Sequence, residues 1–522
     1  MRGWTTIPEL VAAAAAEFGD RDALIEGDVR FSYRELADEI ARAARAFMAH
    51  GIEPGDTIAV WAPNIWQWPI AALGAHLAGA VLVPINTRLK GREAGFVLDR
   101  AKVRMLFTVT DFLDTNYVEE LRSANAAASL EHIVVLRGEI ADGCVSFADF
   151  LARGAEIDDA ERAARSAAVT ADDLCHIMFT SGTTGVPKGA MLMHGPTCRA
   201  YRSWCDVVGL RSDDRYLIVN PFFHSFGMNA GILACFMTGA CNLPHPVFDV
   251  AELMQRVHDD GISMLPGAPA IYQTILNHPD LATFDLSSLR LAVTGAAAIP
   301  VEMIEGMRSR LGFETVVTGY GLTESHGMAT MCRHDDDAVT IATTSGRAID
   351  DVEVRIVDDA GIEVDRGEPG EIVIRGYNLM SGYLDDPEQT AEAIDIDGWL
   401  HTGDIGVMDE RGYIDITDRK KDMFIVGGFN AYPAEIENTL ATHPGIGAAA
   451  VVGVPDDRLG EVGHAFVIPR PGAQLDSAAL NQWCREQMAN YKVPRRFEIV
   501  DAFPLNASGK VLKYELRARA TG

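Results

Sequence analysis

Residues 180–189 (TSGTTGVPKG) bring three glycines, four hydroxyl side chains and one lysine together in one short segment. Glycines let the backbone turn tightly and present amide donors to an anion, and the hydroxyls add further donors. Apolar residues 174–179 predict a buried strand that ends at this turn. We therefore predict a phosphate-binding loop with Lys188 as a nearby cation, formed by Thr180, Ser181, Gly182, Thr183, Thr184 and Gly185.

This loop differs from the P-loop of nucleoside triphosphatases, in which Gly-Lys-Ser/Thr opens a helix. Here Pro187 precedes Lys188 and Gly189 follows it. A polar surface loop without a ligand would explain any three or four of these residues, but it is the weaker explanation for all ten together. Phosphate binding of another kind is therefore indicated.

The segment resembles the phosphate loop of the adenylate-forming superfamily, which contains acyl-CoA synthetases, peptide-synthetase adenylation domains and beetle luciferases. Four more segments follow in the order of that superfamily: YGLTE at 320–324, GWLHTGD at 398–404, DRKKD at 418–422 and PLNASGK at 504–510. Because five segments agree in order, the chain is identified as a member. The resemblance implies ATP-dependent activation of a carboxylic acid as an acyl-adenylate, with ATP, Mg²⁺ and coenzyme A as the expected cofactors.

Activation requires the carboxylate to attack the α-phosphorus of ATP while cations offset the charge on the leaving pyrophosphate. We expect Thr184 and Glu324 to bind Mg²⁺, a hard ion that prefers oxygen ligands. A glutamate after a threonine is usually only solvated, but here a Gly-Tyr-Gly triplet precedes the pair. The resemblance implies that Tyr320 stacks on adenine and that Thr323 contacts the α-phosphate; the nucleotide-binding positions of this segment are Gly319, Tyr320, Gly321 and Thr323.

Two further segments are expected to hold the rest of the nucleotide. Gly295, Ala296 and Ala297 match the segment that lies against adenine in the superfamily, although a plain strand-to-helix turn explains them equally well. Asp404 can accept two hydrogen bonds from ribose hydroxyls, and Arg419 supplies a fixed cation.

The resemblance implies that Lys510 reaches the carboxylate and the α-phosphate during adenylation. Transfer to a thiol then requires Lys510 to leave and a tunnel for pantetheine to form, which a rotating C-terminal domain would achieve. Lys421 occupies the position of the superfamily's hinge residue. Gly427 and Gly428 offer backbone without side chains against which pantetheine could pack, although a simple turn is the alternative.

The acyl pocket is predicted near residues 221–227 (PFFHSFG), where aromatic side chains flank His224. No Asp or Arg lies in residues 222–231 to recognise an amino-acid head group, so we expect a fatty, aromatic or alicyclic acid. Several segments resemble those of the actinobacterial ligases for the bicyclic propanoate left by steroid rings C and D: residues 212–216, 220–224, 230–235, 330–333 and 427–430.

Alternative functions remain open at the level of sequence. A medium- or long-chain fatty acyl-CoA synthetase would carry the same motifs, as would a luciferase-like oxygenase. An acyl-AMP ligase that loads a carrier protein typically has an insertion that blocks CoA, and none is obvious between residues 404 and 432. A peptide-synthetase adenylation domain would need an acidic head-group anchor, and a non-catalytic binding module would not need Lys510, Lys421 and Glu324 together.

The elements that must position these residues form an α/β protein. A chain of 522 residues with 48% hydrophobic content predicts at least two domains. Short β-rich runs alternate with helical patterns through the first 330 residues, which indicates α/β layers with mainly parallel sheets. After residue 345, alternation at 352–357 and 371–374 predicts hairpins of a small β-rich subdomain closing the large unit.

A smaller α+β unit is expected at the C-terminal end, with a helix opened by Pro433 and a strand at 451–454. We therefore predict an AMP-binding N-terminal domain at residues 1–420 and a mobile C-terminal domain at residues 421–522, joined by a short hinge.

Net charge and composition limit the classes of binding partner and the cellular compartment that we expect. A net charge of −29 argues against nucleic acid, because phosphate binding needs clustered Lys and Arg. The eight cysteines form no C-x-x-C pair, and no secretory leader is evident, so reduced thiols in a cytoplasmic enzyme are expected. Polar residues and prolines interrupt the apolar window at 59–85, so we expect no integral membrane segment. The expected partner is a small carboxylic acid, and the oligomeric state is open, with a homodimer among the options.

Overall fold

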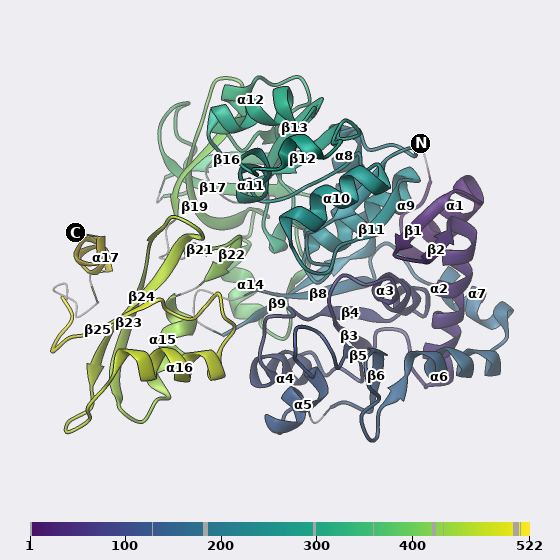
Figure 1. The fold of residues 1–522 in the computed structure, drawn as a ribbon, viewed down its shortest axis with the longest axis horizontal. Helices are drawn as coiled ribbons and strands as arrows, with labels where there is room; N and C mark the ends of the chain where they lie inside the picture. Colours follow the sequence, from purple (N-terminus) through teal and green to yellow (C-terminus); the bar gives the residue numbers. More distant parts are fainter. Residues whose placement is uncertain are drawn as a thin grey trace.

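The computed structural model describes residues 3–127, 129–180, 186–295, 299–358, 360–419, 424–431, 433–504, 511 and 513–521. Two main hydrophobic cores organise the chain. The larger core joins residues between Trp4 and Tyr413, and the smaller one joins residues between Phe424 and Leu516. In Figure 1 the smaller unit, coloured yellow-green to yellow, lies at one side of the large unit.

An eight-stranded sheet forms the first layer of the large unit, with strand order β18-β9-β8-β4-β3-β5-β6-β7. The six strands from β8 to β7 in this order are parallel to one another. Strand β9 runs antiparallel to β8, and β18 runs antiparallel to β9. Parallel strands covered on both faces are apolar along their length. Their bounds are β3 Thr57–Trp61, β4 Val81–Pro84, β5 Met105–Val109, β6 His132–Arg137, β7 Val145–Ser146, β8 Leu174–Thr180, β9 Lys188–Met193 and β18 Gly382–Tyr383.

The second layer contains two four-stranded sheets, ordered β10-β11-β1-β2 and β12-β13-β14-β15, which Met264 bridges. The two α/β layers predicted from sequence are therefore confirmed. The bounds are β1 Asp22–Glu26, β2 Val29–Ser32, β10 Arg215–Ile218, β11 Cys241–Pro244, β12 Leu291–Thr294, β13 Thr315–Tyr320, β14 Thr330–Met331 and β15 Arg347–Ala348.

Helices cover these sheets. Ser32 and Glu35 form the N-terminal capping box of α2, in which Ser32 accepts a hydrogen bond from the Glu35 amide and Glu35 accepts one from the Ser32 amide. The helix bounds are α1 Ile7–Phe18, α2 Tyr33–Ala49, α3 Gln67–Leu77, α4 Gly91–Arg100, α5 Tyr117–Ser123, α6 Phe147–Ala152, α7 Asp159–Ala167, α8 His194–Val208, α9 Ala234–Thr238, α10 Val250–Asp260, α11 Pro269–Leu276, α12 Val301–Arg310 and α13 Ala338–Thr343.

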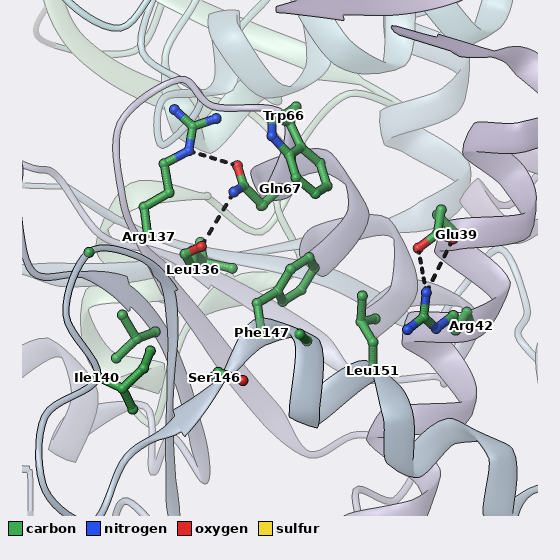
Figure 2. A pocket seen from close by; sticks show the side chains of 13 residues that line it. Glu39, Arg42, Trp66, Gln67, Leu136, Arg137, Ile140, Ser146, Phe147 and Leu151 are labelled. Atoms are coloured by element: carbon green, nitrogen blue, oxygen red, sulfur yellow. Dashed lines mark hydrogen bonds and ion pairs between the residues drawn. The ribbon is translucent and has the colours of Figure 1, made fainter. Parts of the chain in front are cut away.

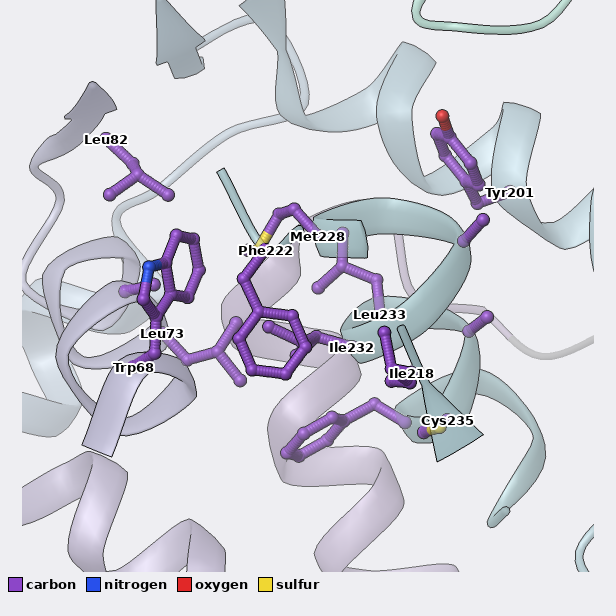
Figure 3. Close-up of a cluster of buried hydrophobic side chains, with 14 of the residues drawn as sticks. Trp68, Leu73, Leu82, Tyr201, Ile218, Phe222, Met228, Ile232, Leu233 and Cys235 are labelled. Atoms are coloured by element: carbon purple, nitrogen blue, oxygen red, sulfur yellow. The ribbon is translucent and has the colours of Figure 1, made fainter. Parts of the chain in front are cut away.

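Buried side chains join the two layers. Figure 3 shows Trp68 of α3 facing Phe222, with Met228 and Ile232 of the π-helix Phe226–Leu233 packed close by. The rings of Trp68 and Phe222 lie 5.5 Å apart between centroids. This core fixes the segment that follows β10, which carries His224, relative to the first sheet.

A four-stranded antiparallel sheet forms the β-rich subdomain, ordered β16-β17-β19-β20. The predicted pairing of residues 352–357 with residues 371–374 is confirmed, since Val357 lies opposite Glu371. Asp359, between these two segments, lies outside the described residues. The bounds are β16 Val352–Val357, β17 Gly370–Gly376, β19 Leu400–Met408 and β20 Ile414–Arg419, and helix α14 spans Pro387–Ala393.

The smaller unit has a five-stranded sheet, and its helix α15 begins at Pro433 as predicted. The bounds are β21 Phe424–Val426, β22 Phe429–Ala431, α15 Pro433–Ala441, β23 Ile446–Asp456, β24 Gly460–Pro469, α16 Ser477–Gln487, β25 Arg496–Ile499 and α17 Lys513–Thr521. Within the part of the chain that the structure describes, no helix has the length and hydropathy that a membrane crossing requires.

Candidate active site

The predicted site residues follow the carboxyl ends of parallel strands. Thr180 ends β8, His224 follows β10, Gly295 follows β12 and Tyr320 ends β13. Loops at the carboxyl edge of α/β sheets form the usual ligand-binding crevice. The fold therefore places each of these motifs at or after the carboxyl end of a strand in its own sheet.

Glu324 links the two layers. It lies in the short 3₁₀ turn Thr323–Ser325 that follows β13, and its Oε1 accepts a hydrogen bond from Tyr383 Oη at 2.8 Å. Thr180 Oγ1, at the end of β8, lies 3.4 Å from the same oxygen. The amide of Met380 donates to the Glu324 carbonyl at 2.8 Å, which fixes the backbone here. The proposed metal ligand is thus held beside the first residue of the phosphate loop.

The turn that carries Glu324 is rigidly supported. A Cβ atom on Gly321 would lie 2.4 Å from the Met328 nitrogen, so this position requires glycine. His326 adopts the left-handed conformation with φ 55°, which a non-glycine residue keeps only where its surroundings enforce it. Burial lowers the pKa of His326 to about 4, so its ring is neutral at pH 7, and Nδ1 donates to the Asn378 carbonyl at 2.7 Å.

Tyr320 and Asp404 form the expected nucleoside end of the site. Tyr320 Oη donates to Asp404 Oδ2 at 2.6 Å, and Asp404 is only 3% exposed. The backbone of Arg419 lies directly opposite Asp404 in the β19–β20 ladder. An ionised carboxylate beside an aromatic ring can accept hydrogen bonds from a ribose while the ring packs on a base.

Lys188 begins β9 directly opposite Thr180. Its ammonium group donates to the side-chain oxygen of Gln389 on α14 and lies 5.1 Å from the centre of the Tyr383 ring. The cation predicted beside the phosphate loop is therefore oriented by two residues from the β18–α14 segment. Sequence reasoning did not single out Tyr383 or Gln389, because neither belongs to a spaced motif.

His224 lies in the connection between β10 and the π-helix Phe226–Leu233. Its side chain is accessible to solvent, yet protein crowds it on most sides, and the resulting desolvation lowers its pKa. The amide of Phe226 donates to His224 Nδ1 at 3.2 Å, so this nitrogen acts as an acceptor. The π-helix that follows is a rare element found mostly at functional sites.

Gly427 and Gly428 form the tip of the β21–β22 hairpin, with φ 56° and 84°, which favour glycine. The adjacent Phe429 ring lies 4.0 Å from the guanidinium carbon of Arg88, which follows β4. Since β4 and β8 are parallel neighbours, Arg88 and Thr180 follow the same edge of the sheet. The hairpin therefore contacts the large unit at the sheet edge where Thr180 ends β8.

Nine predicted site residues lie outside the described residues, as does the side chain of Arg419. They are Ser181, Gly182, Thr183, Thr184, Gly185, Ala296, Ala297, Lys421 and Lys510.

A pocket of about 400 Å³ lies elsewhere, between α2, α3, β6 and α6. Figure 2 shows that its polar groups already have protein partners: Arg137 donates to Gln67, Gln67 donates to the Leu136 carbonyl, and Arg42 pairs with Glu39. Because none of the predicted motif residues lines it, we do not place the active site there.

Family comparisons agree with this geometry. The model of the AMP-binding enzyme family matches residues 11–384, and that of the AMP-binding enzyme C-terminal domain matches residues 435–510. The chain belongs to the AMP-binding enzyme family.

The chain is 50% identical over 517 residues, 98% of each protein, to the 3-[(3aS,4S,7aS)-7a-methyl-1,5-dioxo-octahydro-1H-inden-4-yl]propanoyl:CoA ligase of Rhodococcus jostii (strain RHA1). A ligase of the same name from Mycobacterium tuberculosis is 50% identical over 512 residues, again 98% of each protein. The prediction of an acyl-CoA ligase is confirmed at the level of enzyme class.

Solved structures share the whole fold. The amide bond synthetase McbA from Marinactinospora thermotolerans has a TM-score of 0.85 and 27% identity, covering 99% of this chain and all of that one. A mutant o-succinylbenzoate CoA synthetase from Bacillus subtilis, bound with a product analogue, has a TM-score of 0.81 and 27% identity, covering 98% of each chain. The predicted large N-terminal and small C-terminal parts are confirmed.

Proposed function

We propose that this AMP-forming acid:CoA ligase activates a steroid-derived bicyclic propanoate, the 7a-methyl-1,5-dioxo-octahydroindenyl propanoate. The observation that carries the proposal is 50% identity over 98% of the chain to two ligases named for this acyl group. A preference for a bulky apolar acid is also consistent with the aromatic residues beside His224 and with the absence of Asp and Arg from residues 222–231.

In the first half-reaction, Glu324 and Thr184 would hold Mg²⁺. The donor set fits this hard ion, which usually binds one or two carboxylates together with substrate phosphates. Among the described residues no group of three His, Cys, Asp or Glu side chains is placed to hold a metal. When bound, the ion offsets charge on the phosphates.

The chain's own residues would orient the reactants. Asp404 would accept hydrogen bonds from the ribose hydroxyls, and Tyr320 would pack on adenine. The loop that starts at Thr180 would hold the β- and γ-phosphates, with Lys188 as the adjacent cation. Lys510 would stabilise the carboxylate and α-phosphate as the acyl oxygen attacks phosphorus and pyrophosphate leaves. His224 would border the acyl pocket. Gly295, Ala296 and Ala297 would lie against the base.

In the second half-reaction the thiol of CoA attacks the acyl carbon and AMP leaves. We propose that the described orientation of the smaller unit is the one that performs this step, because the Gly427–Gly428 hairpin lies against Arg88 at the phosphate-loop edge. Rotation about Lys421 would exchange this orientation for the one in which Lys510 adenylates. The domains would then be residues 1–420 and 421–522, in a cytoplasmic enzyme.

The test is CoA-dependent AMP release with Mg-ATP across a panel of acids. We expect turnover with the bicyclic propanoate to exceed that with straight-chain and aromatic acids by at least about tenfold, since one methylene alone changes specificity by about 10- to 200-fold. A preference for straight chains would identify a fatty acyl-CoA synthetase instead. Adenylate formation without a thioester would indicate loading of a carrier protein.

A further inference from the structure

Tyr383 contacts both charged groups of the adenylation site, although it belongs to none of the motifs that predict the site. Its hydroxyl donates to Glu324 Oε1 at 2.8 Å, and its ring lies 5.1 Å from the Lys188 ammonium group. A carboxylate only accepts hydrogen bonds, so the phenol must be the donor. One side chain therefore connects the proposed metal ligand to the proposed phosphate-binding cation.

The position of Tyr383 is fixed by its backbone. Strand β18 pairs with β9, so that Tyr383 lies opposite Ala190, and the amide of Leu384 donates to the Gly189 carbonyl at 2.8 Å. The Tyr383 amide donates to Thr390 Oγ1 of α14 at 2.9 Å. The side chain is only 9% exposed, so it cannot turn into solvent without opening this segment.

The two hydroxyls at Glu324 bind the same oxygen. Tyr383 Oη and Thr180 Oγ1 both lie within hydrogen-bond distance of Oε1, and no described residue donates a hydrogen bond to Oε2. A carboxylate held through one oxygen directs its other oxygen to a metal ion, as supporting hydrogen bonds do at metal sites generally. The hydroxyl of Tyr383 therefore selects the carboxylate orientation that suits an ion shared with ATP.

We propose that Tyr383 is a positioning residue for adenylation: its hydroxyl orients Glu324 toward Mg²⁺, and its ring holds Lys188 beside the phosphate loop. Gln389 supports the same lysine from α14. This inference rests on the proposed function, because it assigns Glu324 and Lys188 to Mg-ATP. Two substitutions separate the two contacts. Tyr383→Phe removes only the hydroxyl, whereas Tyr383→Leu removes the aromatic ring as well.

The matched control is Tyr413→Phe. Tyr413 is 6% exposed and donates to Asp336 at 2.8 Å, so this variant loses a comparable tyrosine–carboxylate hydrogen bond away from the predicted site. Thermal unfolding of all variants verifies that each one folds. The measurements are the Mg²⁺ concentration at half-maximal acyl-adenylate formation, and the calorimetric affinity for ATP as a function of Mg²⁺.

We expect Tyr383→Phe to raise the half-saturating Mg²⁺ concentration about tenfold, the scale of one charge-assisted hydrogen bond. Tyr383→Leu should in addition weaken ATP binding at saturating Mg²⁺, because Lys188 loses its aromatic contact. An unchanged Mg²⁺ dependence in Tyr383→Phe, or an equal change in Tyr413→Phe, would overturn the inference. If the wild-type protein formed no adenylate with any acid, the proposed function would fail, while the Mg²⁺ dependence of ATP binding would still decide the role of Tyr383.

Discussion

Lys492 forms a buried ion pair between the two units, and its disruption should slow only one of the two half-reactions. Its Nζ lies 2.9 Å from Glu93 Oε1 of α4 in the large unit and 2.6 Å from Glu435 Oε1 of α15 in the smaller unit. Lys492 is 4% exposed. Burial raises the pKa of Glu435, so this carboxylate depends on the nearby lysine to stay ionised.

The substitution Glu93→Gln removes only the contact that crosses between the units. Glutamine keeps the size of the side chain and can still accept from the Lys90 amide that caps α4. A hydrogen bond to a charged group contributes about 1.5–3 kcal/mol, and we take the lower end because Glu93 keeps some exposure. A loss of about 1.5 kcal/mol lowers the population of the described orientation roughly tenfold relative to its alternative.

We therefore expect Glu93→Gln to slow thioester formation by up to about tenfold and to leave adenylation unchanged, provided that the described orientation performs the second step. The assay is a single turnover in two stages: pyrophosphate release without CoA, then thioester formation after CoA is added. Glu120→Gln is the matched control, because Glu120 pairs with Lys90 inside the large unit. Slower adenylation with normal thioester formation would refute the reasoning.

Three further outcomes are expected. Burial lowers the pKa of His76 and His326 from 6.5 to about 4, so the unfolded state binds more protons than the folded state below pH 6.5. The free energy of unfolding, measured in urea, should therefore fall by about 2 kcal/mol per histidine between pH 7.5 and pH 5. His76→Phe should make the free energy of unfolding depend less steeply on pH. Asp404→Asn should weaken ATP binding by about tenfold or more in calorimetry, because ribose loses an ionised acceptor. Gly321→Ala should reduce adenylation strongly, because its Cβ would lie 2.4 Å from the Met328 nitrogen. Gly428→Ala should slow thioester formation instead, because alanine is strained at the φ of 84° that Gly428 adopts.

Local patterns predicted much of the fold. Pro433 marks the start of α15, and the apolar run before Thr180 is strand β8. Each of these signals lies within a few residues of the feature it produces. The phosphate loop and the Tyr320–Glu324 segment were likewise visible because each motif is contiguous in the chain.

The contacts between motifs were not predictable from spacing. Tyr383 reaches Glu324 because β18 pairs with β9, a strand about 190 residues earlier in the chain, and a two-residue strand leaves little periodic signal. Lys492 reaches Glu93 across the contact between two separate hydrophobic cores, 399 residues away in the chain. A single sequence contains no pattern that specifies such pairings.

The composition of the contact between the units suits the domain rotation that we propose. If the smaller unit rotates away, Lys492 keeps Glu435, which belongs to the same unit, and only Glu93 is left behind. Glu93 already retains partial exposure at 18% and its capping contact with Lys90, so it can be rehydrated at low cost. If the lysine were paired only with Glu93, rotation of the smaller unit would leave its buried charge without a partner, which would cost about 3–5 kcal/mol. Sharing one cation between two carboxylates therefore keeps both orientations within a few kcal/mol of each other, as a two-step reaction on one site requires.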